Sequence, residues 1–174
     1  MILFFRMKAR VQSYIREQNN PQCFPYITFV YIGFYYQNFE TFFQPTKDFE
    51  FRLPLELTAR LPLYDVRDTG NVVAQCFEHP ERWGQSNIVP IVAQRLTMNE
   101  ICETMRRITG NNQIRFIPVT YDQCSDKTEE FLDNMRWYNE YGNLEDRQED
   151  KTREVYNQMI TLEQWLQESK WLKQ

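Results

Sequence analysis

Residues 61–119 read LPLYDVRDTGNVVAQCFEHPERWGQSNIVPIVAQRLTMNEICETMRRITGNNQIRFIPV, and this stretch decides the fold class. Helix and strand signals alternate along it. Asp68 can cap a helix over residues 69–77, because its carboxylate can accept from a free amide of the first turn. Pro80 and Gly84 then break the chain. The apolar face expected for this helix is Val72, Val73, Cys76 and Phe77.

A strand and a second helix follow. Residues 88–93 are apolar and β-branched and predict a buried strand, although Pro90 favours an edge or a bulge because it cannot donate a ladder hydrogen bond. Residues 97–100 form a capping box, and Gly110 ends the helix that the box begins. Residues 114–119 predict a further strand, so the stretch indicates an α/β or α+β domain. The apolar face expected for the second helix is Ile101, Met105 and Ile108.

Four elements are expected before this stretch. Residues 7–18 favour a helix with Met7, Val11, Tyr14 and Ile15 on one face. Residues 27–32 are β-branched and aromatic on both faces, which is typical of a strand inside a sheet. Residues 34–43 predict a loop entering a short helix, and residues 49–64 a strand or hairpin with one solvent-facing side. The side chains expected to point inward from the short helix are Phe39, Phe42 and Phe43.

Three segments follow the stretch at residues 61–119. Asp126 can cap a helix that Gly142 ends. Residues 143–153 are charged and without apolar periodicity, which favours an exposed loop or a mobile segment. Residues 161–164 form another capping box, which predicts a short amphipathic helix docked on the body. The apolar positions of these two helices are Phe131, Leu132, Met135, Trp137, Tyr138, Leu162, Trp165, Leu166 and Trp171.

Composition limits the classes of protein that the chain can belong to. A length of 174 residues suits one domain, and a net charge of −4 argues against direct nucleic-acid binding. No run of about 18 apolar residues predicts a membrane span. The four cysteines lack metal-site spacing, and Cys76 and Cys102 are expected to be buried free thiols, which suits a reducing compartment. We therefore expect a cytoplasmic protein, with the nucleus as the alternative.

Few residues favour catalysis. The single histidine, His79, lies in a polar turn, and one histidine with scattered cysteines does not predict a metal site. None of the five glycines has the spacing of a phosphate-binding loop. An aromatic cluster follows the strand at residues 27–32, where open α/β sheets place ligands, and it predicts either a small aromatic core or a pocket wall.

Three separated pieces together resemble the NmrA-like family, atypical relatives of the short-chain dehydrogenases. Residues 5–15 (FRMKARVQSYI) look like the family's lysine-bearing helix, and residues 32–39 (IGFYYQNF) resemble its strand followed by an aromatic and amide turn. Residues 61–70 (LPLYDVRDTG), with the downstream 96–100 and 109–110, are similar to its C-terminal lobe. The order and spacing of these pieces make the resemblance more specific than any one of them.

The resemblance implies the C-terminal half of a Rossmann-like fold. It would contain a few mostly parallel strands, flanking helices and a small α+β lobe. Residues 1–174 would form a single domain fragment, with residues 1–48 ending the Rossmann-like core and residues 49–174 forming a lobe for substrate or partner. A complete family member begins with a dinucleotide-binding half that carries a glycine-rich loop, so we expect a truncated protein.

The resemblance also implies a cofactor site for NADP. Lys8 corresponds to the lysine that hydrogen-bonds the nicotinamide ribose, or that relays a proton in the reducing relatives. Tyr35, Tyr36, Gln37 and Asn38 correspond to the turn beside the nicotinamide. No residue is assigned a catalytic or metal-binding role.

Three hypotheses about function follow from the resemblance. The first is a non-catalytic, redox-sensing regulator that binds NADP, weakly without a phosphate cradle, together with a protein partner or a small ligand. The second is an NAD(P)H-dependent reductase of the isoflavone- and quinone-reductase type. The third is an inactive fragment.

Overall fold

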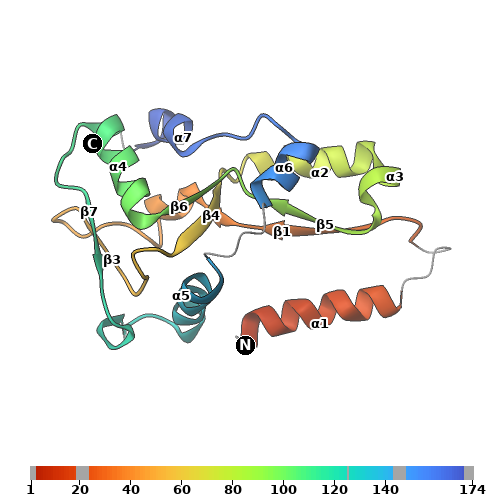
Figure 1. The fold of residues 1–174 in the computed structure, drawn as a ribbon, viewed down its shortest axis with the longest axis horizontal. Coiled ribbons are helices and arrows are strands. Elements are labelled where there is room, and N and C mark those ends of the chain that lie inside the picture. Colours follow the sequence, from red (N-terminus) through yellow and green to blue (C-terminus); the bar gives the residue numbers. More distant parts are fainter. Residues whose placement is uncertain (1–2, 19–23, 125, 143–147, 171–174) are drawn as a thin grey trace.

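The computed structural model describes residues 3–18, 24–124, 126–142 and 148–170 (Figure 1). The helices are α1 (Leu3–Glu17), α2 (Asp68–Glu78), α3 (Pro80–Trp83), α4 (Met98–Thr109), α5 (Glu129–Tyr141), α6 (Gln148–Val155) and α7 (Leu162–Glu168), with 3₁₀ turns η1 (Tyr36–Glu40) and η2 (Tyr121–Cys124). The strands are β1 (Ile27–Ile32), β2 (Phe34–Tyr35), β3 (Glu50–Leu53), β4 (Arg60–Tyr64), β5 (Gln85–Ile91), β6 (Gln94–Thr97) and β7 (Arg115–Pro118).

The strands form three small sheets. Parallel pairing joins β1 to β5, β2 to β4 and β3 to β7, and an antiparallel pairing joins β4 to β6. In the first sheet Val30 lies opposite Val89. The predicted α/β class with mostly parallel strands is confirmed. Strands from residues 1–48 pair with strands from residues 49–174, so the two portions of the chain share sheets.

Two hydrophobic cores hold the fold together. The larger core lies among η1, β3, β4, α4, α5 and α7, and the smaller one lies among β5, α2, α3 and α6. The capping boxes of α4 and α7 are present as predicted, and Gly110 ends α4 with a φ of 73°, which glycine adopts without strain. Ile101 and Met105 are fully buried, as their spacing predicts. Cys76 and Cys102 are buried free thiols, also as expected.

Several local predictions are wrong in the first part of the chain. Among the described residues β1 pairs only with β5, so β1 is not internal to its sheet. Phe42 is 82% exposed, because it lies just beyond η1, whereas Phe39 packs in the core. Strand β4 has no regular solvent-facing side: beyond its first residue, Pro62 is buried as well as Leu61 and Leu63, since β2 and β6 flank the strand and the two cores meet there.

Other predictions are wrong further along. Phe77 points out of α2 and is 81% exposed. Asp68 is the first residue of α2 and does not cap it; its carboxylate accepts from the backbone amide of Ile160 at 2.8 Å. The cap of α5 is Thr128, whose hydroxyl accepts from Phe131, and not Asp126. The short helix α3 occupies residues 80–83, where a break was expected.

Helix α6 lies where an exposed loop was predicted. Thr152 and Val155 of this helix are buried. The Thr152 hydroxyl donates to the Pro90 carbonyl at 2.9 Å and accepts from the Val92 amide at 3.1 Å. These two bonds satisfy backbone groups of the chain at the end of β5, and they hold α6 on the sheet. Residues 143–147, Cys23 and Trp171 lie outside the described residues.

Helix α1 lies on the opposite side of β1 from α2, α3 and α6 (Figure 1). None of its described side chains belongs to either core, and Met7, Val11 and Tyr14 are more than half exposed. Its contacts with the sheet include a hydrogen bond from the Tyr31 hydroxyl to the side-chain oxygen Oε1 of Gln12. In addition, the Arg16 guanidinium lies 5.1 Å from the centre of the Phe29 ring.

We expect α1 to be less stable than the core helices. Few buried contacts hold it, so its amides should open locally at a small fraction of the free energy of global unfolding. Native-state hydrogen exchange should show the amides of α1 exchanging at least about tenfold faster than those of the central turns of α4. Equal protection in the two helices would show that α1 is packed more tightly than its exposure indicates.

None of the helices in the described part of the chain is long and apolar enough to span a bilayer.

Candidate ligand-binding groove

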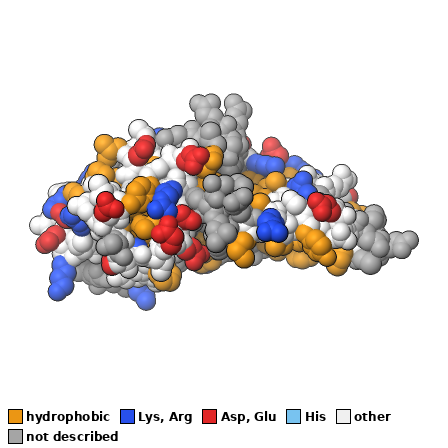
Figure 2. All heavy atoms as spheres, turned by 90° about the horizontal axis from the view of Figure 1, so that it is seen from below, with side chains coloured by type: hydrophobic (Ala, Val, Ile, Leu, Met, Phe, Trp, Pro, Cys, Tyr) orange, Lys and Arg blue, Asp and Glu red, His pale blue; other side chains and the backbone are white. Residues whose placement is uncertain are grey.

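A groove of about 1000 Å³ lies between α1, β1 and α5 and continues to β2 and η1. Figure 2 views the molecule from the side on which α1 and α5 lie, and it shows hydrophobic side chains gathered over the part where α1 runs. Met7, Val11 and Ile15 form the wall from α1, and Phe29 and Tyr31 form the wall from β1. The described lining is mostly apolar, with charges from Lys8 and Glu140.

Gly33 shapes the inner end of the groove. It lies between β1 and β2, and its amide donates to the Ile91 carbonyl at 3.2 Å. A Cβ at this position would lie 2.3 Å from the Pro62 carbonyl oxygen, so only glycine lets the chain pass so close to β4. The chain therefore leaves the sheet of β1 and enters the sheet of β4 at the carboxyl end of β1, where open α/β folds bind ligands.

Three of the residues predicted for the cofactor site line this groove together. Lys8 comes from α1, Tyr35 from β2 and Asn38 from η1. The Tyr35 ring packs edge-to-face on the buried Tyr64, with ring centres 5.1 Å apart. A cation, a phenol and an amide from three separate elements therefore share one surface.

The other two predicted residues point elsewhere. Tyr36 is fully buried, and its hydroxyl donates to the Gln94 side-chain carbonyl at 3.1 Å. Burial, with the charges of Asp65 and Asp68 nearby, raises the pKa of Tyr36 far above its ordinary value. The Gln37 side chain donates to Asp65 at 3.0 Å and accepts from the Val66 amide at 3.2 Å. Both residues therefore support the fold beside the groove and do not line it.

The wall from α5 was predicted only in part as an inward-facing helix side. Trp137 and Tyr138 are among the residues expected to point inward, whereas Asn134 and Tyr141 were not assigned. Trp137 and Tyr141 line the groove with their ring centres 5.7 Å apart, and Tyr138 joins them. Burial raises the pKa of Tyr138. The helical spacing of Asn134, Trp137, Tyr138 and Tyr141 marks one face of α5, but periodicity cannot tell a face that lines a groove from a face that lines a core.

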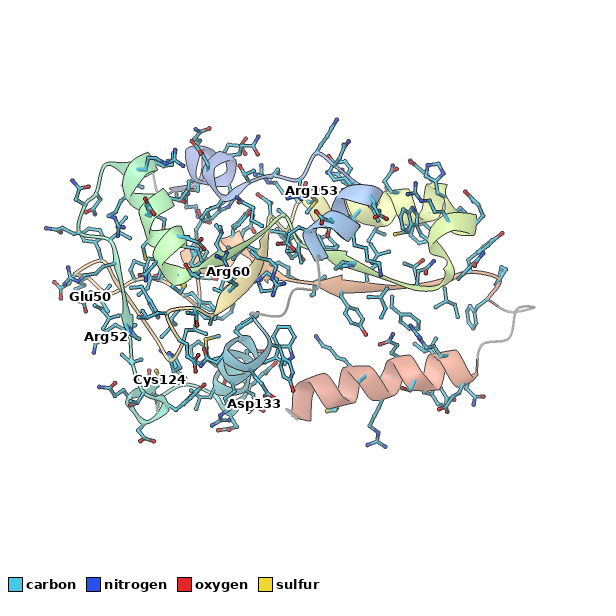
Figure 3. The ribbon with its side chains drawn as sticks, in the orientation of Figure 1. Glu50, Arg52, Arg60, Cys124, Asp133 and Arg153 are labelled. Atoms are coloured by element: carbon cyan, nitrogen blue, oxygen red, sulfur yellow. The ribbon has the colours of Figure 1, made fainter. Side chains whose placement is uncertain are left out.

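Charged groups away from the groove have structural roles. Glu50 of β3 pairs with Arg52 at 3.1 Å and also with Arg115 of β7. The Arg115 and Arg52 guanidinium groups lower the pKa of Glu50. Figure 3 shows Glu50 and Arg52 at the end of the molecule away from α1. No group of three or more potential metal ligands occurs among the described residues.

The chain is similar to several known proteins. The sequence model of the NmrA-like family matches residues 1–166. The nitrogen metabolite repression protein nmr of Neurospora crassa is 31% identical over 124 residues, which cover 66% of this chain and 23% of that protein. An NmrA-like family domain-containing protein of Dictyostelium discoideum is 26% identical over 145 residues, covering 78% of this chain and 46% of that protein.

Solved structures share the fold. The crystal structure of NmrA, a negative transcriptional regulator, in complex with NAD superposes with a TM-score of 0.70 at 19% identity, covering 91% of this chain and 55% of that one. The complex of NmrA with NADP gives a TM-score of 0.65 at 19% identity, covering 81% of this chain and 51% of that one. The chain thus spans about half, or less, of the length of these relatives.

Proposed function

Because the chain belongs to the NmrA-like family, we propose that it is a non-catalytic regulatory protein whose groove binds the nicotinamide end of NADP. One observation supports this most: Lys8, Tyr35 and Asn38 converge from three elements on one groove at the carboxyl end of β1. A second support comes from relatives of the same fold, because NmrA, a negative transcriptional regulator, has been solved with NADP and with NAD.

The lining suits the nicotinamide half of a dinucleotide. Aromatic walls such as Phe29 and Trp137 can pack on a flat ring, since aromatic pairs favour stacked and edge-to-face contacts. The Lys8 ammonium can donate to ribose hydroxyls, and the Asn38 amide can both donate to and accept from a carboxamide. NADP would supply a redox-active ring, and these residues would orient it and exclude water from it.

The same lining favours sensing over catalysis. The described lining of the groove contains no histidine and no cysteine, so it lacks the side chains that most often serve as general base or nucleophile at neutral pH. His79 does not line the groove, and its side chain is 53% exposed. The rival function is an NAD(P)H-dependent reductase with Lys8 as proton relay, and turnover of NADPH in the presence of a quinone would favour it.

We expect the chain by itself to bind NADP weakly. None of its five glycines has the spacing of a phosphate-binding loop, so the pyrophosphate lacks a backbone cradle. A dissociation constant on the order of 1 mM, about −4 kcal/mol, is the expected range. We further propose that regulation acts through a protein partner in the cytoplasm or nucleus, because the net charge of −4 does not favour direct contact with nucleic acid.

Replacing Lys8 by alanine should weaken NADPH binding about fivefold to tenfold, because a charge-assisted hydrogen bond is lost. An NMR titration monitored by chemical shift measures such weak affinities. Arg10→Ala is the matched control, since Arg10 lies on the same helix but does not line the groove. An equal loss of NADPH affinity in both variants would show that Lys8 does not contact the nucleotide.

Two other results would favour the alternative hypotheses, the reductase or the inactive fragment. Oxidation of NADPH by the chain with an added quinone would replace the regulatory proposal with the reductase. No saturable binding of NADPH or NADH at millimolar concentrations would leave the chain without a nucleotide function of its own.

A further inference from the structure

A buried carboxylate, Asp65, lies directly after β4 and does not line the groove. Its side chain is fully buried. Burial by itself would raise the pKa of Asp65, but hydrogen bonds from the side chain and backbone of Arg67 and from Gln37 outweigh it, and the pKa is lowered. A buried charge is costly unless it is paired and hydrogen-bonded, so the arrangement around Asp65 needs an explanation.

Arg67 and Gln37 meet at this carboxylate. Arg67 donates to Asp65 Oδ1 from its backbone N at 2.9 Å and from Nε at 3.0 Å, and to Oδ2 from Nη2 at 2.7 Å. Gln37 Nε2 donates to the same Oδ1 at 3.0 Å. The oxygen Oδ1 therefore accepts three hydrogen bonds, and only the bond from Gln37 comes from outside the loop that follows β4.

Gln37 is held at both ends of its amide. Its Nε2 donates to Asp65, and its Oε1 accepts from the backbone amide of Val66 at 3.2 Å. A side chain with both polar atoms bonded to one loop fixes its own backbone relative to that loop. Gln37 is the second residue of η1, and its neighbour Asn38 lines the groove.

We propose that Asp65 is a positioning residue for the groove: through Gln37 it holds η1 so that Asn38 stays at the groove wall. The effect on ligand binding rests on the proposed function, whereas the effect on η1 does not. Because Asp65 precedes α2 and follows β4, it ties the orientation of η1 to two elements that pack in the cores. Asn38 is then held at the groove wall before any ligand binds.

Two variants test the proposal. Asp65→Asn keeps the shape of the side chain but removes its charge. Gln37→Leu removes the clamp, which is the pair of hydrogen bonds from Gln37 to Asp65 and Val66, while leaving Asp65 paired with Arg67. Glu168→Gln is the matched control, because it removes only the outer hydrogen-bonded ion pair of Arg67, whose Nη1 lies 2.6 Å from Glu168 Oε2. Thr97→Ala is a second control, which lowers stability by removing the cap of α4.

Hydrogen exchange reads the clamp without any ligand. The amides of Thr41 and Phe43 donate to the Asn38 carbonyl at 3.1 and 2.9 Å, so their protection reports the order of η1. We expect exchange at these amides to rise about tenfold in Asp65→Asn and Gln37→Leu and to stay unchanged, relative to the central turns of α5, in both controls. Unchanged exchange in Gln37→Leu would overturn the proposal, whether or not the protein binds nucleotide.

NADPH titration then separates positioning from general stability. Both variants should bind NADPH about fivefold more weakly, and the double variant should be no weaker than either, because the two residues act as one unit. Binding equal to that of the unmodified protein would contradict the positioning role. If the unmodified protein binds no NADPH, the proposed function fails, and the exchange experiment alone decides the clamp.

Discussion

Replacing Gly33 by alanine is expected to destabilise the protein strongly. The new Cβ would lie 2.3 Å from the Pro62 carbonyl oxygen and 3.0 Å from that of Ile91. Both are backbone atoms of the strand region, so relief requires the strands to move apart. We expect the free energy of unfolding to fall by about 3 kcal/mol, the upper range for overpacking. Urea denaturation followed by circular dichroism measures it.

Gly70→Ala is the control for this substitution. A Cβ at Gly70, within α2, would meet no atom within 4 Å. Alanine favours the helix over glycine by about 1 kcal/mol, so this variant should be as stable as the unmodified protein or more stable. If Gly70→Ala lowered the free energy of unfolding as much as Gly33→Ala, the close approach between β1, β2 and β4 would be contradicted.

Replacing Thr152 by valine should cost about 2–4 kcal/mol, because two buried backbone groups lose their partner while the shape is kept. The Thr152 hydroxyl bonds both the Pro90 carbonyl and the Val92 amide. Urea denaturation of the variant gives the loss. We also expect amide exchange across α6 to rise, since this contact attaches the helix to β5.

Thr104→Val is the comparison for Thr152. The Thr104 hydroxyl donates to the Glu100 carbonyl of its own helix at 2.9 Å, and that carbonyl already lies in a helical ladder. Loss of the Thr104 hydroxyl should therefore change the free energy of unfolding by less than about 1 kcal/mol. Similar losses in the two variants would show that α6 does not depend on the bonds of Thr152.

The elements with strong local signals were predictable from the sequence. The capping boxes at residues 97–100 and 161–164 mark the starts of α4 and α7, and Gly110 marks the end of α4, because these signals act within one helical turn. Helix α6 was not predictable. Its buried residues, Thr152 and Val155, form too narrow a stripe, and the bonds that hold it come from residues about 60 positions away.

The candidate site was predictable in part. Four consecutive residues, Tyr35 to Asn38, were assigned to one surface by resemblance. The last three begin a 3₁₀ helix, in which successive side chains point in three directions, so they cannot all face one groove. Tyr35 and Asn38 face it, Tyr36 enters the core, and Gln37 faces Asp65.

The apolar stripe of α1 shows another limit of sequence patterns. Met7, Val11 and Ile15 have the spacing of a buried helix face, yet they line an open groove and remain exposed. Periodicity identifies the face of a helix that avoids solvent, but it does not identify what covers that face.

An NADPH titration followed residue by residue shows whether the groove is the nucleotide site. Isotope-labelled protein would be titrated with NADPH, and the position of every shifted amide and aromatic resonance would be mapped. If the groove binds the nicotinamide end, saturable shifts will concentrate at Lys8, Tyr35, Asn38 and the aromatic residues of α5 that line the groove. Saturable shifts that gather elsewhere and leave these residues unchanged would contradict binding in the groove.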